Sequence, residues 1–599
     1  MTLLYENPSN SAPHWIPSAG AGSFGPAHRG SPVGRHRRPL GRRIFSESGL
    51  VFLAAFAVYF TVAMLLDFRY HAFDGDAISR MANGFYILHS RDPHLAAVGF
   101  VWNPLSSIAD LPLLAFNSVW PALASHNVAG TTMSALAMGG AVYQLHAILR
   151  EWKIAVPQRL ILTLLFAVNP MVLLFGGNGM SEALYLFTML AATRYLLRWL
   201  RTHSLASLVY AALALAFAYL ERSEPVAAAA FAAPLVFWVS YARSDDDRRS
   251  RTWAGLTEVT ILLMPIITAF AGWAVTSWVI TGQPFEQFTS KYGNSALIAA
   301  SHEIKGTMST RLLHEVKAIT YMSPLFALIV IVAVVVAARR RNIEILGVAA
   351  IIGGGLAFTL ASYLDNSIFP WFRYYILMAP LGVLLVGSVL AAPSRLRPAK
   401  TPEMPPGGAP TVTGGRKRLA SAVAGLFTAA MVLVLLVPSV PGTAIGMDNR
   451  AMAPDILLYD GFIFHRHLDA QDIHAKESYS AVRTIADYLN AQHLSNGQVV
   501  VDTADNCIPN VVTNVDNPRM FVIHNDRDFQ RTLDDPLTFH AHYLLVQGSG
   551  SAQTDAVGQQ YPSLGRGAKW ATLVHSFSPK GLCVGFDLYK VTGHTTGNF

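Results

Sequence analysis

The sequence predicts a mainly α-helical, polytopic membrane protein, a transmembrane bundle of about 11 spans with a small α/β domain at its C-terminus. Three observations lead to this prediction. The chain has 599 residues, of which 52% are hydrophobic and only 14% are charged. Residues 49–66 contain no charge, and ~18 uncharged residues suffice for a helix to cross the ~30 Å hydrocarbon layer. About ten similar runs follow, and after residue 440 the pattern changes to short helical and strand-like segments.

Each expected span is an apolar run between charged or Gly- and Pro-containing turns. The expected spans are 49–66, 128–149, 160–175, 183–197, 205–220, 226–242, 259–281, 319–338, 345–364, 375–392 and 419–440. The segment 103–120 is also apolar, but Pro104, Asp110 and Pro112 interrupt it. Whether this segment crosses the membrane decides on which side every later loop lies.

Basic residues indicate the sidedness of the loops, because cytoplasmic loops carry an excess of Lys and Arg. If 103–120 is re-entrant or interfacial, the basic N-terminal tail and four basic clusters share the cytoplasmic side. These clusters lie at 150–159, 198–201, 339–341 and 395–418. Their position in short loops explains the formal net charge of +8 without a nucleic-acid partner. We therefore expect a multi-pass protein of the plasma membrane, surrounded by membrane lipids, with its C-terminal portion outside the cytoplasm.

The domain boundaries follow from this topology. The expected parts are a disordered basic cytoplasmic tail (1–45), a transmembrane core (46–392), a cytoplasmic Pro/Gly-rich linker (393–418), the last transmembrane helix (419–440) and an extracytoplasmic α/β domain (441–599).

The C-terminal portion alternates between helical and strand-like segments, which is typical of a small α/β domain. A helical pattern at 480–493 is followed by strand-like runs at 499–501, 520–524, 543–546 and 586–591. Both cysteines of the chain, Cys507 and Cys583, lie here. A disulfide between them would fit an oxidising compartment, and two unrelated free thiols are the alternative. Asp502 and Asp526 follow two of the strands, where carboxylates usually cap a turn but can also form a site.

Four sets of ionisable residues gather on the expected outer side. They are Asp74-Gly75-Asp76 with Arg80 in the first loop, Glu182 after a glycine-rich turn, the charged turn 221–225 with Arg222, and Arg373 after Asp365. Each has a structural alternative: Asp76 can cap a helix over 77–88, Glu182 can favour a helix N-terminus, and Arg222 can pair with Glu221 or Glu224. Ionisable groups at membrane depth are costly and tend to mark function, so their convergence on one side favours a site.

The order of these motifs resembles the GT-C superfamily of polytopic glycosyltransferases, which includes protein O-mannosyltransferases and lipid A aminoarabinose transferases. The matching segments, within about residues 45–395, are Asp74-Gly75-Asp76, Trp102-Asn103-Pro104-Leu105, Ser181-Glu182-Ala183-Leu184, the turn 221–225, Gly282-Gln283-Pro284-Phe285 and Arg373-Tyr374 with Pro380. The sequence departs from the family pattern in two places. No Pro-Pro pair follows Asn103, and Asp-Gly-Asp replaces adjacent acidic residues, which leaves the identity of the base open.

The resemblance implies an enzyme of cell-envelope biogenesis that moves a sugar, mannose or arabinose, from a polyprenyl-phosphate donor. The acceptor would be a glycan, glycolipid or protein, and the mechanism would invert the anomeric centre. By this resemblance Asp74 or Asp76 is the base, with a slight preference for Asp74, and Glu182 positions the acceptor. The expected donor-phosphate ligands are Arg222 and Arg373, with Lys291 and Arg80 as weaker candidates.

The sequence alone leaves alternatives for the cofactor and for the function. The sequence of the membrane part contains no zinc motif, and no metal ligands are assigned from it. Asp74, Asp76 and Glu182 are nevertheless candidates to hold Mg²⁺ or Mn²⁺, which some members of the superfamily bind and others do not need. The alternative function is a transporter or flippase of polyprenyl-linked glycans, although transporters usually show internal repeats that are not evident here.

Overall fold

The computed structural model describes most of the chain between residues 46 and 593. The described residues are 46–244, 247–290, 298, 306–391, 430, 432–454, 456, 470–504, 507–548, 555–578, 583 and 585–593. The expected tail 1–45, the linker 393–418 and most of the last expected span 419–440 lie outside them. Residues from Glu47 onward belong to one structural unit.

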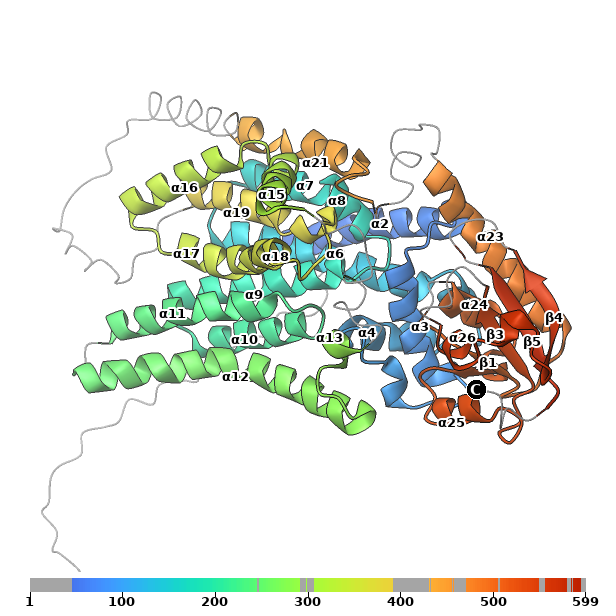
Figure 1. The fold of residues 1–599 in the computed structure, drawn as a ribbon. Coiled ribbons are helices and arrows are strands. Elements are labelled where there is room, and N and C mark those ends of the chain that lie inside the picture. Colours follow the sequence, from blue (N-terminus) through green and yellow to red (C-terminus); the bar gives the residue numbers. More distant parts are fainter. Residues whose placement is uncertain are drawn as a thin grey trace, which may run out of the picture. The chain divides into compact units, whose positions relative to one another are not determined.

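The first part of the chain is a bundle of mostly apolar helices (Figure 1). Its elements are α2 (Glu47–Met64), η1 (Leu65–Tyr70), α3 (Gly75–His89), η2 (Leu95–Val98), α4 (Leu105–Leu114), α5 (Ala122–Ser125), α6 (Val128–Glu151), α7 (Val156–Ala167), α8 (Pro170–Phe175), α9 (Glu182–Thr202), α10 (Leu205–Tyr219), α11 (Pro225–Arg243), α12 (Arg248–Thr281), α13 (Glu286–Thr289), α15 (Met308–Met322), α16 (Phe326–Arg340), α17 (Glu344–Val348), η3 (Ala349–Gly353), α18 (Gly354–Leu364), η4 (Phe372–Tyr375), α19 (Met378–Leu390) and α21 (Ser439–Asp448).

The helices long and apolar enough to cross a membrane make this an integral membrane protein. Within the described residues five qualify, namely Glu47–Tyr70, Pro225–Arg243, Arg248–Thr281, Glu344–Leu364 and Phe372–Leu390. The pair α15 and α16, bent by 75°, adds a sixth if it forms one broken span. Most other expected spans are present as helices that are shorter or more polar, so the count of eleven stays a prediction. Helix α4 has 10 residues, which extend about 15 Å, too short to cross the hydrocarbon layer.

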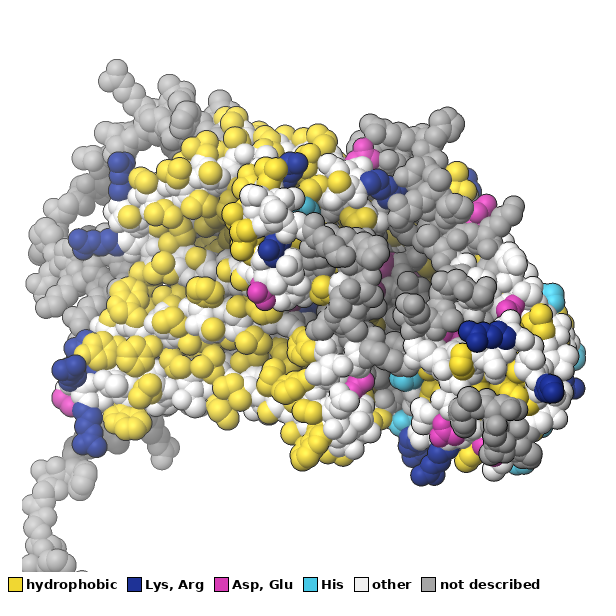
Figure 2. All heavy atoms as spheres, in the orientation of Figure 1, with side chains coloured by type: hydrophobic (Ala, Val, Ile, Leu, Met, Phe, Trp, Pro, Cys, Tyr) yellow, Lys and Arg dark blue, Asp and Glu magenta, His cyan; other side chains and the backbone are white. Residues whose placement is uncertain are grey.

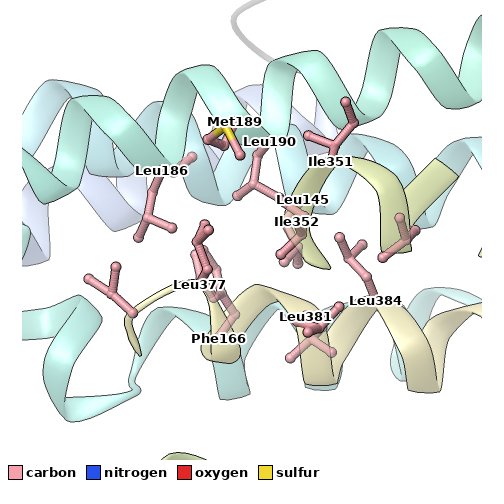
Figure 3. Close-up of a cluster of buried hydrophobic side chains, with 14 of the residues drawn as sticks. Leu145, Phe166, Leu186, Met189, Leu190, Ile351, Ile352, Leu377, Leu381 and Leu384 are labelled. Atoms are coloured by element: carbon pink, nitrogen blue, oxygen red, sulfur yellow. The ribbon is translucent and has the colours of Figure 1, made fainter. Parts of the chain in front are cut away.

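Small residues let the central helices approach each other closely. A Cβ added to Gly140 on α6 would lie 2.7 Å from the ring of Phe187 on α9, so any larger residue would force this ring to shift. Around it lies a continuous buried cluster from α6, α7, α9, η3 and α19 (Figure 3). It includes Leu145, Phe166, Leu186, Met189, Leu190, Ile351, Ile352, Leu377, Leu381 and Leu384. Hydrophobic side chains also cover the outer face of the bundle in Figure 2, as expected of a surface that meets lipid.

The C-terminal part is the expected α/β domain, built on a mixed five-stranded sheet. Its elements are α23 (Ala470–Ala491), β1 (Val499–Val501), α24 (Ile508–Asn514), η5 (Pro518–Met520), β2 (Phe521–Ile523), α25 (Phe529–Asp534), β3 (Tyr543–Gln547), α26 (Ala556–Gln560), η6 (Leu564–Arg566), β4 (Ala571–Phe577) and β5 (Phe586–Val591). The strand order is β2-β1-β3-β5-β4. Strands β1, β2 and β3 are parallel, whereas β5 is antiparallel to both β3 and β4.

Strand β4 was not predicted, because most of its residues are exposed and it lacks the alternation of a half-buried strand. The structure joins Cys507, at the start of α24, to Cys583, in the loop between β4 and β5, as a disulfide. This was one of the two alternatives that the sequence left open.

Helix α3 connects the bundle to the C-terminal domain. Its buried residues Ile78, Met81 and Phe85 belong to the same hydrophobic cluster as side chains of α23, α24 and β2. Figure 1 shows α3 next to α24. At the end of α3, Arg91 forms an ion pair with Asp526, with 3.1 Å between Nη2 and Oδ2. The helix that opens with Asp76 is therefore fixed to the domain formed some 400 residues later.

Candidate functional site

The two carboxylates of the Asp-Gly-Asp motif have different roles at the start of α3. Asp74 is the N-cap, and its Oδ1 accepts a hydrogen bond of 3.0 Å from the backbone N–H of Asp76. The alternative in which Asp76 caps the helix is therefore wrong. Asp76 is the second residue of the helix, and its carboxylate accepts a 2.8 Å hydrogen bond from Nη2 of Arg373. Asp74 thus caps its own helix, whereas Asp76 is bound to a residue from a distant chain segment.

Arg373 lies at the centre of the candidate site. It belongs to the short helix η4, and its side chain is only 4% exposed. Besides Asp76 it approaches Glu182, with 3.9 Å between Nε and Oε1. Its guanidinium also lies 4.4 Å from the ring centroid of Trp371, a distance at which a cation is attracted to the face of an indole. One buried cation thus connects the first loop with the start of α9.

Arg222 adds a second cation to the same carboxylate. Its Nη1 lies 3.0 Å from Oε1 of Glu182, and its Nε lies 2.8 Å from Oε1 of Glu224. The ring centroid of Tyr374 lies 5.1 Å from the guanidinium carbon. Glu182, whose side chain is 1% exposed, therefore lies between two arginines from different loops. Of the two partners expected for Arg222, Glu224 is the one that it binds.

The other carboxylate of this turn, Glu221, pairs with Arg80 instead. The two groups are 3.8 Å apart, and Ser106 donates a hydrogen bond to the same carboxylate oxygen. Arg80 also stacks over the ring of Trp102 at 4.6 Å. Burial raises the pKa of Glu221 to about 7, although the positive charge of Arg80 opposes this shift. Sequence reasoning did not give Glu221 a part of its own, because charged turns usually pair within themselves.

These residues line one wall of a cavity of about 1300 Å³. Asp76, Arg80, Glu221, Arg222 and Arg373 all contribute to its surface. Apolar side chains line another part of it, including Ile280, Phe288, Phe358, Ile368 and Phe369. The cavity is large for a single small molecule, since typical ligand pockets hold about 300–1000 Å³. It therefore offers space for a bulky amphipathic ligand or for two ligands side by side.

The C-terminal domain supplies the remaining wall of the cavity. The lining residues of this domain are Thr503, Ala504, Pro509, His524, Asn525, Asp526 and Arg527. The sequence predicted Asp526 at a strand end without indicating that it would face the membrane bundle.

The structure brings together most of the residues expected at the site. Asp76, Glu182, Arg222, Arg373 and Arg80 lie at the cavity or in direct contact with residues that line it. Asp74 instead caps α3, and Lys291 lies outside the described residues. Trp371 and Tyr374 lie against the arginines. Tyr374 belongs to the Arg373-Tyr374 motif noted in the sequence, but neither aromatic residue was assigned a role there.

The carboxylates considered as cation ligands do not form such a group. Among the described residues no three His, Cys, Asp or Glu side chains are placed to hold one metal ion. Asp74 is used by its own helix, and Asp76 and Glu182 are bound to arginines. The residues present therefore do not fit a divalent cation at this position.

Comparisons with known proteins give distant likenesses. No protein-family model and no curated protein matches the chain. Among solved structures, ArnT from Cupriavidus metallidurans bound to undecaprenyl phosphate is 12% identical over 91% of this chain and 98% of its own, with a TM-score of 0.48. The same ArnT in the apo state is 14% identical over 90% and 97%, with a TM-score of 0.47. The archaeal oligosaccharyltransferase AglB from Archaeoglobus fulgidus is 10% identical over 83% of this chain and 69% of its own, with a TM-score of 0.41.

Proposed function

We propose that this protein is a membrane glycosyltransferase that moves a sugar from a polyprenyl-phosphate donor to an acceptor hydroxyl on the outer face of the plasma membrane. The observation that carries the proposal is the position of Arg373, buried between Asp76 and Glu182 at the wall of a large cavity. Such an arrangement provides a base and a phosphate ligand in direct contact. The order of the motifs along the sequence supports the same reaction.

The proposed chemistry uses each of these groups. Asp76 accepts the proton of the acceptor hydroxyl group while the oxygen of that hydroxyl attacks the anomeric carbon of the donor. The new oxygen–carbon bond forms as the bond between the anomeric carbon and the phosphate oxygen breaks, and the configuration inverts. The leaving polyprenyl phosphate gains negative charge, which Arg222 and Arg373 stabilise through their planar, forked N–H groups. Glu182 keeps both arginines in place.

The cavity suits a donor with one polar and one apolar end. Charged side chains line the wall formed by α3, the turn 221–224 and η4, while Phe358, Ile368 and Phe369 line another part. A polyprenyl-phosphate sugar presents a charged head group and a long hydrocarbon chain, so it matches both surfaces. The basic clusters on the opposite loops support an outer location, where nucleotide sugars are absent. Mannose and arabinose are the sugars we propose, with a cell-envelope molecule as acceptor.

The experiment that tests the base compares two isosteric variants. Asp76→Asn removes the proton acceptor, and we expect transfer from a polyprenyl-phosphate sugar to fall by at least about 10²-fold in isolated membranes. Asp74→Asn is the matched control, because asparagine caps a helix about as well as aspartate. We expect this control to keep activity within about threefold.

The opposite pattern, an active Asp76→Asn and an inactive Asp74→Asn, would assign the base to Asp74. If both variants keep full activity, the catalytic assignment is wrong. If instead the wild-type protein moves a polyprenyl-linked glycan across vesicles without transferring a sugar, the transporter alternative holds.

A further inference from the structure

The C-terminal domain presents the ends of two parallel strands to the cavity. Strands β1 and β2 are parallel neighbours, with Val501 paired to Ile523 at their ends. Residues shortly after these strands line the cavity, namely Thr503 and Ala504 after β1 and residues 524–527 after β2. In open α/β sheets, ligands bind outside the carboxyl ends of parallel strands. The same edge of this sheet faces the wall that carries Asp76.

We infer that this edge is the acceptor subsite and that it takes an uncharged carbohydrate, a conclusion that rests on the proposed glycosyl transfer. Its side chains include a hydroxyl from Thr503, an imidazole from His524 and an amide from Asn525. Each sugar hydroxyl both donates and accepts hydrogen bonds, so a surface of mixed donors and acceptors suits it.

The charges of this edge are compensated within the protein. Asp526 pairs with Arg91, which also contacts Asp528, and Arg527 pairs with Asp92. The two charged side chains of this edge that line the cavity, Asp526 and Arg527, therefore both have partners of opposite charge within the protein. An acidic or basic acceptor would require an unpaired counter-charge, so a neutral glycan matches better than a charged peptide.

One buried polar atom of this edge also points to a ligand. Asp526 has a side chain that is 0% exposed, and it lines the cavity. Its Oδ2 accepts bonds from Arg91 and from the backbone N–H of Ile523. Its Oδ1 has no hydrogen-bond partner among the described residues. Because a buried carboxylate oxygen without a donor is costly, a donor from a bound ligand would stabilise it.

Hydrogen bonds and ion pairs also join this edge to the segment that follows α3. Asn525 donates a 2.6 Å hydrogen bond from Nδ2 to the backbone carbonyl of Ala97, and Arg527 Nε donates one of 2.9 Å to Asp92. Together with the pair of Arg91 and Asp526, these bonds connect the strand ends to the segment after α3. An acceptor bound here would thus be fixed relative to Asp76, as transfer requires.

The test measures acceptor affinity separately from donor binding. The full-length protein in nanodiscs is supplied with a radiolabelled polyprenyl-phosphate sugar and with alkyl glycosides of mannose, arabinose, glucose or galactose. The variant Thr503→Val, His524→Phe removes hydrogen-bonding groups while keeping side-chain size. We expect it to raise the acceptor KM about tenfold, to lower kcat less than threefold and to leave polyprenyl phosphate binding unchanged.

The matched control is Thr572→Val, on the exposed strand β4 away from the cavity. We expect it to keep the wild-type acceptor KM. Two results would overturn the inference without contradicting the proposed glycosyl transfer. One is an unchanged acceptor KM in the double variant, and the other is transfer to Ser- and Thr-containing peptides but not to glycosides. If the wild-type protein neither binds polyprenyl phosphate nor transfers any sugar, the proposed function fails and this inference falls with it.

Discussion

Arg373 donates a 2.8 Å hydrogen bond to Asp76, although 297 residues separate the two in the chain. The contact joins the first loop of the bundle to the segment before α19, and both residues line the same cavity. The guanidinium is nearly inaccessible, so its charge is balanced by Asp76 and Glu182 rather than by water. The residues that we propose as the base and as a phosphate ligand are thereby held in contact.

Two substitutions of Arg373 distinguish the effect of its positive charge from the effect of its planar guanidinium group. Arg373→Ala leaves two carboxylates without this cation, and we expect polyprenyl phosphate binding and transfer to fall at least about 10²-fold. Arg373→Lys keeps a positive charge but cannot bridge two groups with a planar fork, so we expect a loss of about 10-fold. Arg201→Lys, which alters the pair of Arg201 with Glu344 outside the cavity, is the control and should keep activity. Equal activity of Arg373→Ala and the wild type would remove Arg373 from the site.

The ionisation of Glu221 predicts a pH dependence of stability. Burial raises the pKa of Glu221 from its ordinary value of 4.5 to about 7. Between these values the unfolded chain loses this proton while the folded protein keeps it, so this residue makes stability fall as pH rises from about 4.5 to about 7. Glu221→Gln cannot ionise, and its melting temperature relative to the wild type should rise across that window and level off above it. Thermal unfolding at several pH values in one detergent measures this difference, and a difference independent of pH would contradict the assignment.

The disulfide should stabilise the domain that closes the cavity. Cys507 and Cys583 are 76 residues apart in the chain, and closing a loop of that size corresponds to about 4 kcal/mol in the chain-entropy model. The variant Cys507→Ser, Cys583→Ser should therefore lower the melting temperature clearly. Treating the wild type with a reductant should reproduce the shift, and treating the variant should have no further effect. A melting temperature equal to that of the oxidised wild type would show that the domain does not depend on this bond.

Much of the fold could be predicted because local composition specifies it. Uncharged runs mark the helices of the bundle, and β-branched runs such as Val499–Val501 mark strands of the domain. Strand β4 was not predicted, because an exposed strand lacks the alternation of apolar and polar residues that marks a strand with one buried face. The number of spans does not follow from composition alone, because several helices in the bundle are short or contain polar residues.

The candidate site was only partly predictable, for a different reason. Asp-Gly-Asp offers two carboxylates that can cap a helix, and the extended backbone at Asp74, with φ −79° and ψ 131°, decides between them. The pairing of Glu221 with Arg80 rather than Arg222 depends on how α3 packs against the turn after α10, which no local pattern encodes. The contribution of residues 524–527 to the cavity depends on contacts between segments more than 400 residues apart.

Removing Arg91 should destabilise the junction between α3 and the C-terminal domain in a pH-dependent way. Burial raises the pKa of Asp526 to about 6, while the charge of Arg91 opposes the shift. Without Arg91 the carboxylate faces Asp528 with only the backbone N–H of Ile523 as a donor in the described structure, so its pKa should rise further. At pH 5 Asp526 is then neutral and Arg91→Ala should cost little stability. At pH 8 the Asp526 carboxyl group of the variant must either ionise without a cationic partner or stay protonated at a pH at which the unfolded chain releases the proton. Both cost free energy, and we expect the free energy of unfolding to fall by about 2 kcal/mol.

The control for this prediction is the double variant Arg91→Ala, Asp526→Asn, which has no titrating group at position 526. The difference in free energy of unfolding between this double variant and Asp526→Asn should be the same at pH 5 and pH 8. The difference between Arg91→Ala and the wild type should instead grow from pH 5 to pH 8. Thermal or denaturant unfolding of all four proteins completes the cycle. A loss from Arg91→Ala that is equal at both pH values would mean that the contribution of Arg91 does not depend on the ionisation of Asp526, and that it comes from packing or from the ion pair with Asp528.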